Sequence, residues 1–162
     1  MEIKKVNIKN VVVANEIITN QFPFGWDCMA LATSLEVVFF EDGQFKKEVY
    51  MIDPRFGCDL PHTEVELEYV DNVEEMLLEY KKFLLQQRIQ ESLKNRHSIN
   101  AQVGDTIEVY KGRKFPKGQR FVVKREYVWR DAYGREQSWY WITEDGKKVD
   151  QFNCIIVDGK IE

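Results

Sequence analysis

Hydrophobic and polar positions alternate with strand periodicity in the first part of the chain. In the segment T-E-V-E-L-E-Y-V, Val65, Leu67 and Tyr69 alternate with glutamates. This pattern is typical of a half-buried strand with one polar face. Other runs are rich in β-branched and aromatic residues, which favour strands. Together these patterns predict an antiparallel sheet with strands at 6–19, 35–40, 45–52 and 63–70.

Residues typical of turns and helix caps separate these runs. Asp42-Gly43 lies between two apolar segments, where such a pair predicts a tight hairpin. Asp71 is followed three residues later by Glu74, which is a capping-box pattern. We therefore expect one long helix from about residue 72 to residue 97.

The predicted helix changes character along its length. Its first half is apolar at helical spacing, and its second half, from Gln86, is mostly polar. The pattern predicts that the first half packs on the sheet and that the second half is a spacer with little burial. The apolar positions expected to face the sheet are Met76, Leu77, Tyr80, Phe83 and Leu84.

Short, turn-separated runs predict five strands after residue 100. Several short strands in about sixty residues favour a small SH3-like barrel. The chain is therefore predicted to be α+β, with a sheet and long helix in residues 1–100 and a barrel in residues 101–162. The expected barrel strands are 106–110, 120–125, 127–130, 138–143 and 153–157.

Charge is unevenly distributed, with an excess of basic residues at the start of this second part. The whole chain has a net charge of −4, yet residues 101–126 hold seven Lys/Arg against three Asp/Glu. Four of these cations, Lys111, Arg113, Lys114 and Lys117, fall in a connection marked by Gly112 and Pro116. The bulk charge argues against a general polyanion binder, so we expect a local contact surface. A solvated loop that aids solubility is the other interpretation.

Spacing in this region resembles a known module. The pattern is Gly104-Asp105, Ile107, Val109, Gly112, Pro116 and Gly118. It resembles the start of a KOW-type SH3-like barrel, a module found in ribosomal proteins and transcription elongation factors. Residues 111–118 also resemble the K/R-G-R-K-x-P-x-G signature of a group of uncharacterised bacterial and phage-type proteins. The resemblance implies a non-enzymatic module that binds RNA, DNA or a protein that handles nucleic acid.

The candidate contact surface combines the basic loop with aromatic residues. Lysine and arginine neutralise phosphates, and exposed aromatic rings stack on bases. A cluster of three tryptophans and two tyrosines within residues 129–141 is crowded for a small barrel core, so part of it is expected to be exposed or to pack on the helix or front sheet. The predicted site residues are Tyr110, Lys111, Arg113, Lys114, Phe115, Lys117, Arg120, Trp139 and Trp141.

Two other groups of residues suggest different functions. Glu64, Glu66 and Glu68 form an acidic strand face, which together with exposed aromatics favours a protein–protein adaptor or a phage-type inhibitor of a host protein. Cys58 and His62 place a thiol and an imidazole in one segment. No oxyanion-hole pattern accompanies them, so we do not expect an enzyme.

Cysteine usage and hydropathy indicate the environment of the protein. Cys28, Cys58 and Cys154 are odd in number and widely spaced, which predicts free thiols without disulfide, zinc or other cofactor. No apolar run approaches the ~20 residues of a membrane span, and the start of the chain lacks a signal-peptide pattern. We expect a soluble, cytoplasmic protein without membrane association.

Overall fold

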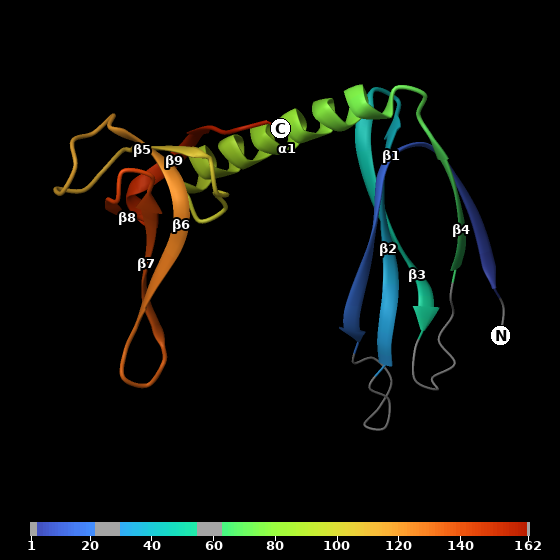
Figure 1. Cartoon of the computed structure of the whole chain (residues 1–162), viewed down its shortest axis with the longest axis horizontal. Helices are drawn as coiled ribbons and strands as arrows, with labels where there is room; N and C mark the ends of the chain where they lie inside the picture. The colour runs from blue at the N-terminus through green and yellow to red at the C-terminus, as the bar shows by residue number, and fades with distance from the viewer. Residues whose placement is uncertain (1–2, 22–29, 55–62, 162) are drawn as a thin grey trace. The chain divides into compact units, whose positions relative to one another are not determined.

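The computed structural model describes residues 3–21, 30–54 and 63–161 (Figure 1). Within these ranges lie one α-helix, nine β-strands in two open sheets and one short 3-10 helix, which confirms the mixed α+β class. The chain divides into two compact units, Met1–Tyr80 and Lys81–Glu162. The helix in the described ranges is not long and apolar enough to cross a membrane.

The first unit is a four-stranded sheet in the order β3-β2-β1-β4. The hairpin between β2 and β3 turns at Asp42 and Gly43, whose φ angles are 53° and 74°. Left-handed conformations at both positions match the twist of the flanking strands, so the predicted tight turn is confirmed. The strands are β1 (Lys4–Gln21), β2 (Ala30–Glu41), β3 (Gln44–Pro54) and β4 (Thr63–Tyr69).

The prediction of a purely antiparallel sheet is wrong, because β4 pairs with β1 in parallel. The cause is a break within β1. Asn10 has a φ of 57°, and the pairing registers of both neighbours shift next to it. The part of β1 before Asn10 pairs mainly with β4, whereas the part after Val11 pairs with β2, and the ribbon bends between them (Figure 1). Because β1 arches over at this break, its two parts run in different directions (Figure 1). β4 is parallel to the first part and β2 is antiparallel to the second part, so β4 and β2 can run in the same direction.

The core of this unit lies on one face of the sheet. Val65 and Leu67 pack against it as the alternation predicted, whereas Tyr69 is exposed. The buried cluster consists of Ile8, Val11, Val37 and Phe39. Tyr80, in the first half of α1 (Val73–Asn95), lies outside this cluster, and its ring centroid is 5.2 Å from that of Phe45.

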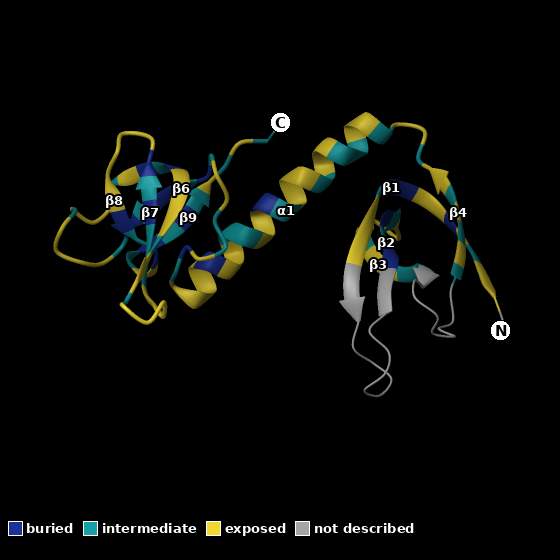
Figure 2. Cartoon of the chain, turned by 60° about the horizontal axis from the view of Figure 1, so that its bottom comes forward, coloured by how far each residue is buried: buried dark blue, intermediate teal, exposed yellow. Residues whose placement is uncertain are grey.

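The second half of α1 belongs to the second unit and is not the spacer that its polar sequence predicted. Leu85 is 4% exposed and Ser92 is fully buried, although most of the helix surface is exposed (Figure 2). Arg88 forms a part-buried ion pair with Asp105, and the Ser92 hydroxyl accepts a hydrogen bond from the backbone N–H of Ile156. These polar contacts accompany the buried Leu85 and the packing of Ile89 on the core of the second unit, and the thinning hydrophobic stripe did not predict them. The unit therefore starts some twenty residues before the predicted boundary at residue 100.

The second sheet has five strands in the order β8-β7-β6-β5-β9. Two separate strands had been expected over residues 120–130, but they form the single strand β6. The pairing register shifts between Val123 and Arg125, where the strand passes from β5 to β7, and no turn intervenes. The elements are β5 (Thr106–Val109), β6 (Arg120–Arg130), β7 (Glu136–Thr143), β8 (Lys148–Asp150), η1 (Gln151–Asn153) and β9 (Cys154–Asp158).

The core of the second unit gathers inward-facing residues from all five strands. Ile89 of the helix and Phe115 of the β5–β6 loop pack against it. Since the strands are short, the sheet alone leaves part of the core exposed to solvent, and Ile89 and Phe115 cover this part. The buried residues are Ile107, Val109, Phe121, Val123, Trp141, Val149, Cys154 and Ile156.

Cys154 is a free thiol with no exposed surface, and burial, with a smaller effect from Asp150, raises its pKa to about 12. In a Cys28→Ser/Cys58→Ser background, we expect Cys154 to resist a thiol-specific reagent at pH 8 until the protein unfolds. Because the raised pKa favours the neutral thiol, its contribution to stability persists below pH 9 and declines as the pH rises toward 12. Rapid labelling under native conditions would contradict this burial. Cys28, Cys58 and His62 lie outside the described residues.

Candidate functional site

The basic loop, defined as residues 110–119, connects β5 to β6 and is closed at its base by two backbone hydrogen bonds. The N–H of Gly118 donates to the Val109 carbonyl at 2.8 Å, and the N–H of Val109 donates to the Gln119 carbonyl at 2.9 Å. Gly118 has a φ of 89°, which permits the chain to reverse there. The four loop cations are thereby presented on a closed turn.

The start of the loop is fixed to the segment around η1. Tyr110 donates its backbone N–H to the Asn153 carbonyl at 3.0 Å, and its hydroxyl donates to the carbonyls of Phe152 and Arg96. Gly112 has a φ of 103°, and a Cβ there would lie 2.8 Å from the Asn153 side-chain nitrogen. The positive φ, together with this close approach, favours glycine at the position. Tyr110 therefore orients the loop, whereas the sequence had suggested that it contacts a ligand.

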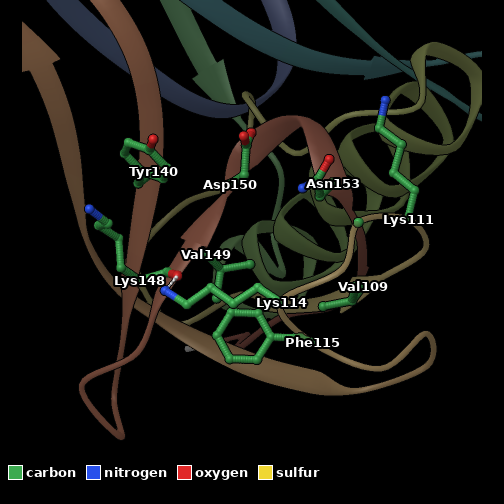
Figure 3. Close-up of a pocket in the computed structure, with 10 residues that line it drawn as sticks. Val109, Lys111, Lys114, Phe115, Tyr140, Lys148, Val149, Asp150 and Asn153 are labelled. Carbon is green, nitrogen blue, oxygen red and sulfur yellow. Dashed lines mark hydrogen bonds between the residues drawn. The ribbon is translucent and has the colours of Figure 1, made fainter.

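The middle of the loop is anchored by Phe115. Its ring is half-buried and meets Phe121 edge-on, with centroids 5.0 Å apart. The Lys114 ammonium lies 5.2 Å from the Phe115 centroid and donates to the Lys148 carbonyl at 3.1 Å. These contacts hold the Lys114 side chain across the space between the loop and β8 (Figure 3).

A pocket of about 210 Å³ lies between the loop and the β8–η1 segment. Its apolar part is formed by Val109, Phe115 and Val149, and its rim carries ammonium groups (Figure 3). Such a lining suits a ligand with a flat apolar body and negative charge. The lining residues are Val109, Lys111, Gly112, Lys114, Phe115, Tyr140, Lys148, Val149, Asp150 and Asn153.

The loop cations are available for an external anion. Among the described residues, Lys111, Arg113, Lys114 and Lys117 have no carboxylate within 4.0 Å. Arg120 differs, because its guanidinium pairs with Glu108 at 3.1 Å. Four of the five predicted cations thus keep an uncompensated charge, and Arg120 is partly neutralised.

Asp150 is the one carboxylate in the pocket lining. It caps η1 by accepting the backbone N–H of Phe152 at 2.8 Å. Its charge is therefore partly compensated by a structural hydrogen bond, and the rim of the pocket keeps an excess of positive charge.

The two predicted tryptophans occupy a different part of the unit. Trp141 is 5% exposed, and its indole N–H donates to the backbone and hydroxyl oxygens of Ser98 at 3.2 and 3.0 Å. Trp139 is half-buried against Phe152 and donates to Glu136. Alternation places both on the inner side of β7, so the structure removes Trp141 from the candidate surface.

Exposed aromatics lie on the opposite side, and the predicted site did not include them. Tyr127 and Trp129 are 37% and 48% exposed on β6, and Tyr127 pairs with Tyr140 across the ladder. The period-two spacing of Tyr127 and Trp129 was the available signal. To assign Tyr127 and Trp129 to the exposed face from this spacing, one must already know that Trp139 and Trp141 face inward.

No family model, curated protein or solved structure matches the chain. The site must therefore be interpreted from its own residues.

The other predicted sites do not assemble further chemistry in the described ranges. Glu64, Glu66 and Glu68 are exposed on β4, and Glu64 lies 3.8 Å from the Lys5 ammonium. Within residues 3–21, 30–54 and 63–161, no three His, Cys, Asp or Glu side chains are grouped closely enough to hold a metal ion.

Proposed function

We propose that residues 81–162 form a non-enzymatic module that binds nucleic acid through the basic loop. The observation that carries this proposal is the set of four loop cations without carboxylate partners among the described residues, two of which, Lys111 and Lys114, line a pocket with an aromatic wall. Phosphate neutralisation releases condensed counterions, which makes such a cluster more favourable toward a polyanion than toward single anions. A local cluster suffices for this even though the whole chain carries a net charge of −4.

The strand connectivity supports a finer proposal, that this unit is an SH3-like barrel related to KOW-type modules. The first and last strands of this unit, β5 and β9, are neighbours in an otherwise sequential order. The start of β6 pairs with β5 and the rest of it pairs with β7. The short helix η1 directly precedes the last strand. This order is what we expect of a small barrel in which one long bent strand joins two layers.

Replacing Lys111, Arg113, Lys114 and Lys117 together by glutamine tests the loop directly. We expect loss of most nucleic-acid affinity, and a slope of log affinity against log salt that is shallower by up to about 3–4, since each phosphate contact contributes roughly 0.7–0.9. Fluorescence anisotropy over a salt series measures both. A matched control replaces four exposed lysines elsewhere, Lys4, Lys9, Lys94 and Lys160, so that the net charge changes equally. Unchanged RNA and DNA affinity in the loop variant would overturn the proposal.

A second candidate function is a protein–protein adaptor or inhibitor that acts through the acidic face of the first unit. Glu66 and Glu68 favour it, because they are exposed on an edge strand and have no ion pair among the described residues. A pull-down with and without nuclease separates the two functions. A partner retained after nuclease treatment supports the adaptor, whereas a partner lost with the nucleic acid supports the basic-loop proposal.

A further inference from the structure

The outer face of the β6–β7 ribbon carries an aromatic strip, defined here as Tyr127, Trp129 and Tyr140. Tyr127 lies directly opposite Tyr140, and their ring centroids are 6.2 Å apart. Trp129 lies two residues further along β6, on the same face by strand alternation. The three rings therefore form a row across two strands that faces away from the core.

Trp129 of the strip lacks the polar partners that hold the tryptophans of the inner face. The indole N–H groups of Trp139 and Trp141 have partners in Glu136 and Ser98. Trp129 is 48% exposed, and its N–H has no hydrogen-bond partner among the described residues. Large, rigid and partly exposed aromatic rings are typical of a contact surface.

Positive charge accompanies the strip. The Lys148 ammonium lies 4.6 Å from the Tyr140 centroid and 5.6 Å from that of Tyr127. Arg125 lies on the same face, two residues before Tyr127, and neither cation is in an ion pair among the described residues. The strip thus combines π-faces with cations, as single-strand binding platforms do.

The strip continues into the site already described. Tyr140 of the strip and the adjacent Lys148 both line the pocket beneath the basic loop. Asp150 lies opposite Tyr140 at this junction and is engaged in capping η1. An extended ligand can therefore contact the strip and the loop cations together.

We propose that a single-stranded nucleic acid lies along this face, with successive bases stacked on the aromatic strip and its phosphates near Lys148, Arg125 and the basic loop. This inference rests on the proposed function and specifies its ligand. The aromatic rings recognise base faces, and the unpaired cations provide the charge complementarity that a polyanion requires.

The spacing of the rings favours a single strand over a duplex. Positions two residues apart on a strand are separated by about 6.8 Å, whereas stacked bases in a duplex rise by about 3.4 Å per nucleotide. Bases on neighbouring rings must therefore be unstacked from one another. In a duplex the base faces are covered by adjacent pairs, so a duplex can reach the loop cations but not the rings.

The test measures binding of the full chain to a fluorescein-labelled twelve-nucleotide oligo(dT), its RNA counterpart and a duplex of equal length. Trp129→Ala and Tyr127→Ala are each expected to weaken single-strand binding by about 5- to 150-fold, the equivalent of one lost base–aromatic stack. Duplex binding and the salt slope should not change. Trp129→Phe keeps an aromatic ring, so it should retain most of the affinity while removing most of the tryptophan quenching on binding. The matched control is Trp139→Phe on the inner face, which should change neither the affinity nor the quenching.

The outcomes separate this inference from the proposed function. If the strip variants bind single strands as the wild type does, while the loop variant loses binding, the strip inference is wrong and the loop proposal stands. Equal weakening of single-strand and duplex binding by Trp129→Ala would also overturn stacking. If the wild type binds neither ligand at low salt, both proposals fail.

Discussion

Replacing Arg88 with alanine is expected to lower the free energy of unfolding by about 3–5 kcal/mol, because it leaves the Asp105 carboxylate buried without its partner. The guanidinium contacts both carboxylate oxygens, at 3.1 and 3.3 Å. The Asp105 side chain is 3% exposed, and its other partner is the backbone N–H of Gln102. Urea or guanidinium denaturation followed by circular dichroism measures the change.

Two comparisons make this result specific. Arg120→Ala breaks the more exposed pair with Glu108 and should cost no more than about 1 kcal/mol. The double variant Arg88→Met/Asp105→Asn should be less destabilised than Arg88→Ala, since no buried charge is left. A cost for Arg88→Ala similar to that for Arg120→Ala would show that the pair does not support the fold.

A fragment of residues 81–162 is expected to fold, whereas a fragment of residues 101–162 is expected not to. The shorter fragment lacks the Arg88 guanidinium that neutralises Asp105 and the Ser98 oxygens that accept the Trp141 N–H. It also uncovers core surface that Ile89 covers. For a unit this small, the loss of several buried contacts removes most of its stability.

The measurement is a ¹H–¹⁵N correlation spectrum of each fragment with its thermal melt and tryptophan emission. We expect dispersed peaks and a cooperative transition for residues 81–162 alone. A dispersed spectrum and native tryptophan emission from residues 101–162 would contradict the assignment of the helix to this unit.

Short sequence patterns predicted those features of the fold that depend on neighbouring residues, namely a hairpin turn and the buried face of a strand. Asp42-Gly43 specified its hairpin because the turn type requires left-handed φ at both residues, and the alternation at Val65 and Leu67 reported which face is buried. The break at Asn10 and the partner change in β6 were not predictable, because both depend on which distant strands are available. Tertiary pairing decided these features, and residue propensity did not.

The same distinction applies to the candidate site. The loop cations were found because Gly112 and Pro116 mark the connection in which they lie. Trp141 was misplaced, because its burial depends on Ser98, forty-three residues away, as its indole partner. Trp129 of the predicted aromatic cluster was left out of the site and Tyr127 was overlooked, because the pairing of β6 with β7 decides which side of the ribbon faces solvent.

The hydrogen bond between Ser92 and Ile156 also bears on association between molecules. β9 is an outer strand of its sheet, and the unpaired backbone donors of such a strand can template the addition of another chain. By accepting the Ile156 N–H at 2.8 Å, the helix occupies one of these donors with a side chain that cannot propagate a sheet. At Ile156, the serine hydroxyl thus takes the donor that an added strand would need for pairing.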